Sequence, residues 1–166
     1  MKITKGVEWA AHACTLLAVL PDGWALSAEA LAEYHDVPPA YMAKQMQALS
    51  KLGIVMSQRG AVGGYRLAKP AAQITLWDIT AAIEGSAASF RCTEIRQNGP
   101  CGAAVKDCKT PCGIAASFYR AEQAFRAELG KVTLVDLMSL AGEDSTAEKA
   151  GAIAVWVQDN AARQSS

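Results

Sequence analysis

The chain has 166 residues, of which 51% are hydrophobic, and its formal net charge at neutral pH is zero. Such a chain forms one domain, or one domain with an appended arm, and can bury a real core. No apolar run approaches the length that spans a membrane, so no membrane partner is expected.

The first predicted helix covers residues 3–20. Its buried stripe follows helical spacing: Val7, Ala10, Ala11, Cys14, Leu17 and Ala18. Glu8 and His12 interrupt the apolar stretch, which favours a helix of a cytoplasmic protein over a signal peptide. These two residues are one turn apart on a neighbouring face, next to Trp9. They form either an ordinary surface contact or a two-ligand arm for a metal.

The next two predicted helices are separated by a tight turn. Ser27 caps the segment SAEALAEYH, and Pro38-Pro39 opens a third helix that Gly53 stops. The core stripe of the third helix is Met42, Met46 and Leu49, whereas Tyr41, Lys44 and Lys51 fall on its other faces. This arrangement predicts a helix-turn-helix.

Two short strands follow, at residues 54–57 and 65–68, around a glycine-rich tip that carries Arg59. From Pro38 to Pro70 the chain has five Lys or Arg residues and no Asp or Glu. A basic hairpin after a helix-turn-helix predicts a winged DNA-binding domain, with Tyr41, Lys44, Lys51 and Arg59 as its DNA contacts. The alternative, a helical bundle with a hairpin, leaves the acid-free block unexplained.

In the second half of the chain, the sequence predicts a helix at residues 75–85 and a long helix from near Cys112 to Leu129, which Gly130 stops. A T-x-x-D cap starts the first of these, and a second T-x-x-D cap at Thr133 starts a short helix that ends near Leu140. The long helix carries apolar residues at near-heptad intervals: Ile114, Phe118, Ala121, Phe125 and Leu129. This stripe is either a dimerisation seam or an ordinary core-facing stripe. Residues 142–149 are expected to form a loop, followed by a short helix around Trp156 and a frayed end.

The segment from Phe90 to Cys112, here called the cysteine loop, holds four of the five cysteines. Its glycines and prolines exclude a long helix or strand. The cysteines are spaced C-x8-C, C-x6-C and C-x3-C, which disfavours structural zinc. Thiols gathered on such a loop suit a metal or iron–sulfur cluster, disulfide formation, or oxidant sensing.

Together these elements resemble the IscR/NsrR/RsrR family of winged-helix iron–sulfur transcription regulators, and the RsrR-like branch most closely. The similarity covers most of residues 1–140 and rests on the wing GIVMSQRGAVGGYRLAKP, the helix ITLWDITAAIEG, the cysteine loop and the long helix followed by VTLVDL. It implies a homodimer with crossing long helices. It also implies a 2Fe–2S cluster where each cysteine loop meets the first helix of the partner subunit.

The resemblance implies a ligand set as well. The RsrR-like pattern matches Glu8, His12, Cys108 and Cys112, with Trp9 as a possible cluster gate. The commoner family pattern uses three loop cysteines and would include Cys92, but Cys101 and Cys108 do not fall on its usual spacing. Cys92 and Cys101 are therefore the less favoured ligands.

We accordingly expect a mainly α fold with a small β wing. The expected divisions are a DNA-binding domain (1–85), a cluster-binding loop (86–112), a dimerisation helix with the following short helix (112–141) and a C-terminal arm (142–166). The expected function is redox-responsive regulation of transcription on double-stranded promoter DNA in a bacterial cytoplasm, without enzymatic activity. The alternatives are a cluster-free thiol and disulfide sensor, and an enzyme or electron carrier that uses the cluster.

Overall fold

A computed structural model describes residues 3–58, 63–143 and 146–163. Its helices are α1 (Lys5–Ala18), α2 (Ala28–Tyr34), α3 (Pro39–Lys51), α4 (Leu76–Glu84), α5 (Gly113–Lys131), α6 (Leu134–Glu143) and α7 (Ala147–Asn160). Its strands are β1 (Trp24–Ala25), β2 (Val55–Gln58), β3 (Gly64–Leu67) and β4 (Ala162–Arg163), and 3₁₀ turns η1 (Ala71–Gln73), η2 (Ile95–Gln97) and η3 (Val105–Asp107) complete it. The predicted fold class, mainly α with a small β wing, is confirmed, and the pair β1–β4 adds to it.

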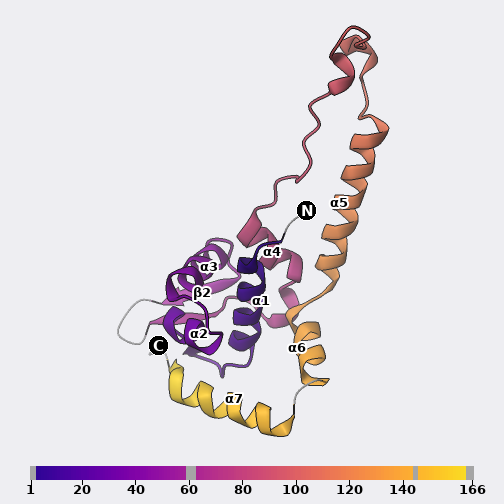
Figure 1. The fold of residues 1–166 in the computed structure, drawn as a ribbon. Coiled ribbons are helices and arrows are strands. Elements are labelled where there is room, and N and C mark those ends of the chain that lie inside the picture. Colours follow the sequence, from indigo (N-terminus) through magenta and orange to yellow (C-terminus); the bar gives the residue numbers. More distant parts are fainter. Residues whose placement is uncertain (1–2, 59–62, 144–145, 164–166) are drawn as a thin grey trace.

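The body of the molecule is formed by α1 to α4, and α5 extends away from it toward the cysteine loop (Figure 1). The predicted stripe of α3 is confirmed, because Met42, Met46 and Leu49 are fully buried. At the crossing of α1 and α3, a Cβ added to Gly6 would lie 3.0 Å from Gln45 Nε2. The absence of a side chain at Gly6 therefore lets the two helices approach closely.

The wing strands β2 and β3 pair antiparallel, with Val55 opposite Leu67 and Gln58 opposite Gly64. Leu26 follows β1 and exchanges two backbone hydrogen bonds with Tyr65, at 3.1 and 2.7 Å. The wing is thereby fixed to the segment that precedes the helix-turn-helix. The two predicted strands are present, each within one residue of the expected range.

Both predicted T-x-x-D caps form. Thr75 Oγ1 accepts from the Asp78 amide at 3.1 Å, and the Thr75 amide donates to Asp78 Oδ2 at 2.8 Å. The same reciprocal pattern joins Thr133 and Asp136. An antiparallel bridge between Thr75 and Thr133 brings the two caps side by side. This contact places the start of α4 against the junction of α5 and α6.

Three expectations for the C-terminal third are wrong. Gly130 does not stop α5, which continues to Lys131, and most of the loop expected at residues 142–149 is helical. The end expected to fray, residues 160–166, is ordered as far as residue 163, where β4 pairs with β1. The helix predicted around Trp156 is present as α7, and Trp156 packs against Tyr34 with 4.7 Å between ring centroids. Burial of Val157 and the added strand order a segment whose local sequence signals are weak.

The apolar stripe predicted along α5 is largely open to solvent in the single chain, with Ile114 69% and Phe118 51% exposed. Phe90 of the cysteine loop stacks on Phe118, with 4.6 Å between the ring centroids. The body of the molecule therefore does not cover the first turns of this stripe. Among the helices of the described residues, none is long and apolar enough to cross a membrane.

Candidate functional site

The helix-turn-helix presents polar and basic side chains on the outer side of α3. The α3 core residues face α1, whereas Tyr41 is 57% exposed and Lys44 and Lys51 are also exposed. No acidic side chain lies in the first turn of α3. The positive helix N-terminus and the lysines therefore form a surface suited to phosphate groups. Arg59, the fourth predicted DNA contact, lies outside the described residues.

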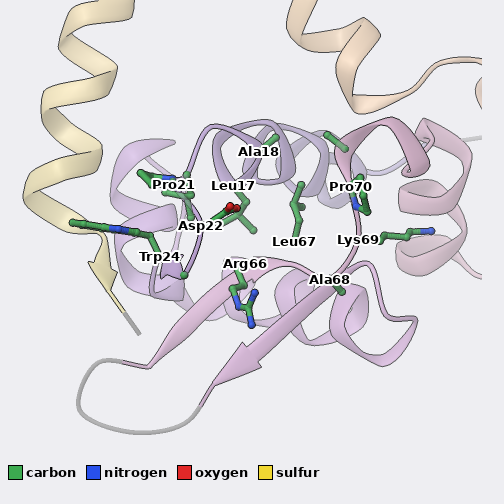
Figure 2. Close-up of a pocket in the computed structure, with 13 residues that line it drawn as sticks. Leu17, Ala18, Pro21, Asp22, Trp24, Arg66, Leu67, Ala68, Lys69 and Pro70 are labelled. Carbon is green, nitrogen blue, oxygen red and sulfur yellow. The ribbon is translucent and has the colours of Figure 1, made fainter. Parts of the chain in front are cut away.

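A cavity of about 440 Å³ is lined by the end of α1 on one side and by the wing on the other. Figure 2 shows Asp22 and Leu17 on one side of it and Arg66 on β3 on the other. Lys69 also lines the cavity, with its Nζ 3.9 Å from Asp78 Oδ2. Two cations of the acid-free block thus lie at the base of the wing.

The two candidate ligands on α1, Glu8 and His12, are exposed, while Trp9 between them is half-buried. The Trp9 ring meets the Tyr41 ring edge-on, with 6.1 Å between centroids. Sequence reasoning placed Trp9 beside the ligand pair and Tyr41 on the DNA-contacting helix, but it did not show that they touch. This contact joins the candidate ligand face of α1 directly to the start of α3.

His35, in the turn of the helix-turn-helix, is a neighbour that the sequence did not reveal. Its ring lies 5.8 Å from the His12 ring, and among the described residues its buried Nε2 has no hydrogen-bond partner. Burial lowers the pKa of His35, and the nearby His12 charge lowers it further. Because residues 12 and 35 meet only through tertiary packing, no sequence pattern predicts the pair.

Cys108 ends the turn η3, four residues before Cys112 at the start of α5, and both cysteines are half-buried. Cys112 is the N-cap of this helix, and its Sγ accepts a hydrogen bond from the Ala115 amide at 3.4 Å. Cys92 Sγ accepts one from the Glu94 amide, also at 3.4 Å. Cys101 is exposed. All of these thiols are free, so they can act as soft metal ligands.

The four favoured ligands do not meet within one chain. The cysteine loop lies at the far end of α5, away from α1 in the body (Figure 1). Throughout the described residues, no group of three or more His, Cys, Asp or Glu could hold a metal ion. Two thiols on one chain and a carboxylate with an imidazole on another therefore fit a cluster only if two chains combine.

The fifth cysteine belongs to the core. Cys14 is fully buried on α1, and burial raises the pKa of its thiol to about 12. A thiol held protonated and shielded from solvent is a poor metal ligand and a poor nucleophile. The prediction that Cys14 is a core residue is confirmed.

These features define a winged helix-turn-helix protein of the transcription regulator class. The chain belongs to the Rrf2 family, described as iron-dependent transcriptional regulators, whose model matches residues 3–140. It is 37% identical over 91 residues to YwgB of Bacillus subtilis and 39% identical over 90 residues to slr0846 of Synechocystis. Both are named as candidate HTH-type transcriptional regulators. The matches cover 55% and 54% of this chain, and 58% and 61% of those proteins, so less than two thirds of their length.

Solved structures share the fold. CymR (YrzC), the global cysteine regulator of B. subtilis, superposes with a TM-score of 0.64 at 23% identity, covering 84% of this chain and 98% of that one. IscR of T. potens gives a TM-score of 0.61 at 23% identity, covering 89% and 93%. The oxidized form of Staphylococcus aureus CymR gives 0.60 at 25% identity, covering 82% and 95%. The fold is therefore shared with regulators of different names.

Proposed function

We propose that this chain is a redox-responsive, DNA-binding transcription regulator that senses through a 2Fe–2S cluster held between two copies, as in the RsrR-like branch. The observation that carries the proposal is the division of donors. Cys108 and Cys112 lie in the cysteine loop, just before the long helix, while the exposed Glu8–His12 face lies on the body of each chain. The family's description as iron-dependent regulators supports it.

The donor chemistry fits such a group. Thiolates are soft ligands for iron and sulfide, and imidazole and carboxylate complete a mixed set that removes thiolate charge. Cys108 and Cys112 would hold one iron, and the partner's Glu8 and the partner's His12 the other. When bound, the cluster supplies a one-electron redox change at a potential higher than that of an all-cysteine site.

A contact route from the ligands to DNA supports the sensing role. Trp9 lies between Glu8 and His12 in sequence and touches Tyr41 at the start of α3. A change of charge beside the ligand face of α1 would act first on this ring pair, so Trp9 could gate the position of α3. The spacing of two such helices in a dimer sets DNA affinity.

The proposed DNA contacts are Tyr41, Lys44, Lys51 and Arg59, on a duplex promoter in the cytoplasm. Each lysine replaced by alanine should weaken binding on all sequences and reduce the slope of log affinity against log salt by about one. Arg59→Ala should cost more, because a wing-tip arginine can enter the minor groove. Unchanged affinity in Lys44→Ala and Arg59→Ala at moderate salt would contradict this interface.

The ligand assignment is tested on protein purified without oxygen, by iron content and visible absorbance. Cys108→Ala and Cys112→Ala should lose the colour, and Glu8→Ala or His12→Ala should labilise the cluster or change its spectrum. Cys101→Ala should be silent and Cys92→Ala nearly so. His12→Cys should keep the cluster but lower its potential, because thiolate adds negative charge.

The three-cysteine scheme predicts a different pattern for two of these variants. Under that scheme, the Cys92→Ala protein should lose the visible colour of the cluster, and the Glu8→Ala protein should keep it. Loss of the cluster in Cys92→Ala together with an unchanged Glu8→Ala spectrum would therefore reject the Glu–His assignment while leaving the iron–sulfur function intact.

A cluster-free thiol sensor is the second candidate function. Cys101 is exposed and Cys108 and Cys112 are half-buried and free, so all three could form disulfides. The structural similarity to the oxidized form of Staphylococcus aureus CymR supports this second candidate function. Anaerobically purified protein that is colourless and free of iron, yet loses DNA affinity on oxidation, would establish it.

A further inference from the structure

In the cysteine loop, two aliphatic side chains are more exposed than one ion pair. Its aliphatic side chains Ile95 and Val105 are each 74% exposed. The charged side chains of Arg96 and Glu94 are only 32% and 30% exposed, and Cys108 and Cys112 are half-buried. The Glu94–Arg96 ion pair is thus less exposed than these two aliphatic side chains, although burial normally favours apolar groups.

Arg96 closes the loop on itself. Its Nη2 donates to the Thr110 carbonyl at 2.8 Å, fourteen residues away and between Cys108 and Cys112. Its own carbonyl accepts from the Ala103 amide at 2.8 Å. One residue therefore ties the turn η2 to both later parts of the loop. Among the described residues, the buried core cluster contains no side chain of this loop, so such bonds hold the loop's conformation.

Glu94 fixes the guanidinium in place. Nε and Nη2 of Arg96 donate to the two carboxylate oxygens of Glu94, at 2.5 and 2.8 Å, as a two-bond fork. Glu94 has a φ of 53°, a left-handed conformation that a non-glycine residue rarely adopts. The hydrogen bonds with Glu94 raise the pKa of Arg96, and the nearby Cys108 and Cys112 add to that shift. Because the guanidinium is bonded to the Thr110 carbonyl, it lies beside the short segment that carries both candidate thiolate ligands.

We propose that Arg96 is the positioning residue of the cysteine site: it presents Cys108 and Cys112 as a preformed pair and balances their negative charge. Only the charge-balancing role rests on the proposed cluster function. The hydrogen bonds of Arg96 to Glu94 and Thr110, here called the clamp, form in the chain without any bound group. A lysine cannot reproduce the clamp, since it lacks the planar fork that bonds Glu94 and Thr110 together.

Hydrogen exchange of the full-length, cluster-free protein tests the clamp. Arg96→Gln should speed exchange of the Ala103 and Cys108 amides about tenfold, as loss of one net hydrogen bond to a charged group predicts. Arg96→Lys should do the same. The matched control is Lys109→Gln, which removes the same charge from an exposed residue beside Cys108 and should leave exchange unchanged. Equal rates in wild type and Arg96→Gln, or an equal effect of Lys109→Gln, would overturn the clamp.

The charge role has its own readout in loaded protein. The midpoint potential should fall in Arg96→Gln, because a cation beside a negatively charged cluster favours its reduced form. Arg96→Lys should retain most of the wild-type potential. An unchanged potential in Arg96→Gln would remove the charge role. If wild type assembles no cluster, the proposed function fails, but the exchange experiment still decides whether Arg96 orders the thiol pair.

Discussion

Gly64→Ala should displace the wing from the body of the molecule. A Cβ at this position would lie 2.8 Å from the Leu26 carbonyl oxygen and 3.1 Å from Ala25 Cβ. The backbone would have to move, and the hydrogen bonds between Leu26 and Tyr65, at 3.1 and 2.7 Å, would lengthen. Backbone atoms of a paired strand cannot rotate away as a flexible side chain can.

The expected cost follows from these contacts. Overpacking of this kind costs about 1–3 kcal/mol, and each backbone hydrogen bond contributes about 1 kcal/mol net. The free energy of unfolding should therefore fall by about 2 kcal/mol, which at a urea dependence of about 2 kcal/mol per molar lowers the midpoint by about 1 M. Promoter affinity should fall as well, because the wing no longer lies in register with α3.

Gly151→Ala is the matched control, since no heavy atom lies within 4 Å of its added Cβ. In the interior of α7 the same methyl group should stabilise the protein by about 0.5–1 kcal/mol. Urea unfolding at one fixed protein concentration compares the two variants, because a dimer's stability depends on concentration. A Gly64→Ala midpoint equal to or above that of Gly151→Ala would refute the reasoning.

Three further predictions concern other parts of the chain. Trp156→Ala should lower the free energy of unfolding by about 2–3 kcal/mol through lost burial and ring contact, whereas Val155→Ala, at a residue 59% exposed, should change it little. Phe118→Glu should convert a dimer to monomers in sedimentation, since a dry seam would have to bury a charge, and Gln123→Glu on an exposed part of α5 is its comparison. A wild-type monomer would contradict the seam. Because burial raises the pKa of Cys14 to about 12, its stabilising contribution is complete below the pKa of an unfolded thiol and is lost as pH rises toward 12. In Cys14→Ala, the free energy of unfolding should therefore fall less as the pH rises into the alkaline range. An equal fall in wild type and Cys14→Ala would contradict this prediction.

Local signals in the sequence determined most of the helical framework. Thr75 and Thr133 cap helices because their hydroxyl groups and the aspartates three residues later satisfy free amides, and this needs no tertiary context. The α3 stripe needs only helical periodicity, so Met42 and Met46 were correctly placed in the core. The wing follows from two short strands around glycines. The positions of the four loop cysteines, and of the glycines and prolines that make the loop irregular, also follow directly from the sequence.

Packing between distant segments decided the rest. The Trp9–Tyr41 contact and the His12–His35 pair join residues on different helices, and nothing local sets their distance. The helix α7 was underestimated because its order comes from Trp156 and Val157 packing onto the body, an energy that a local window does not contain. The hydrogen bond from Arg96 to the Thr110 carbonyl is likewise a product of chain folding, because the two residues are fourteen positions apart. The sequence thus determined which side chains could act, and the tertiary structure decided which of them meet, because free energy gained between distant segments has no local signature.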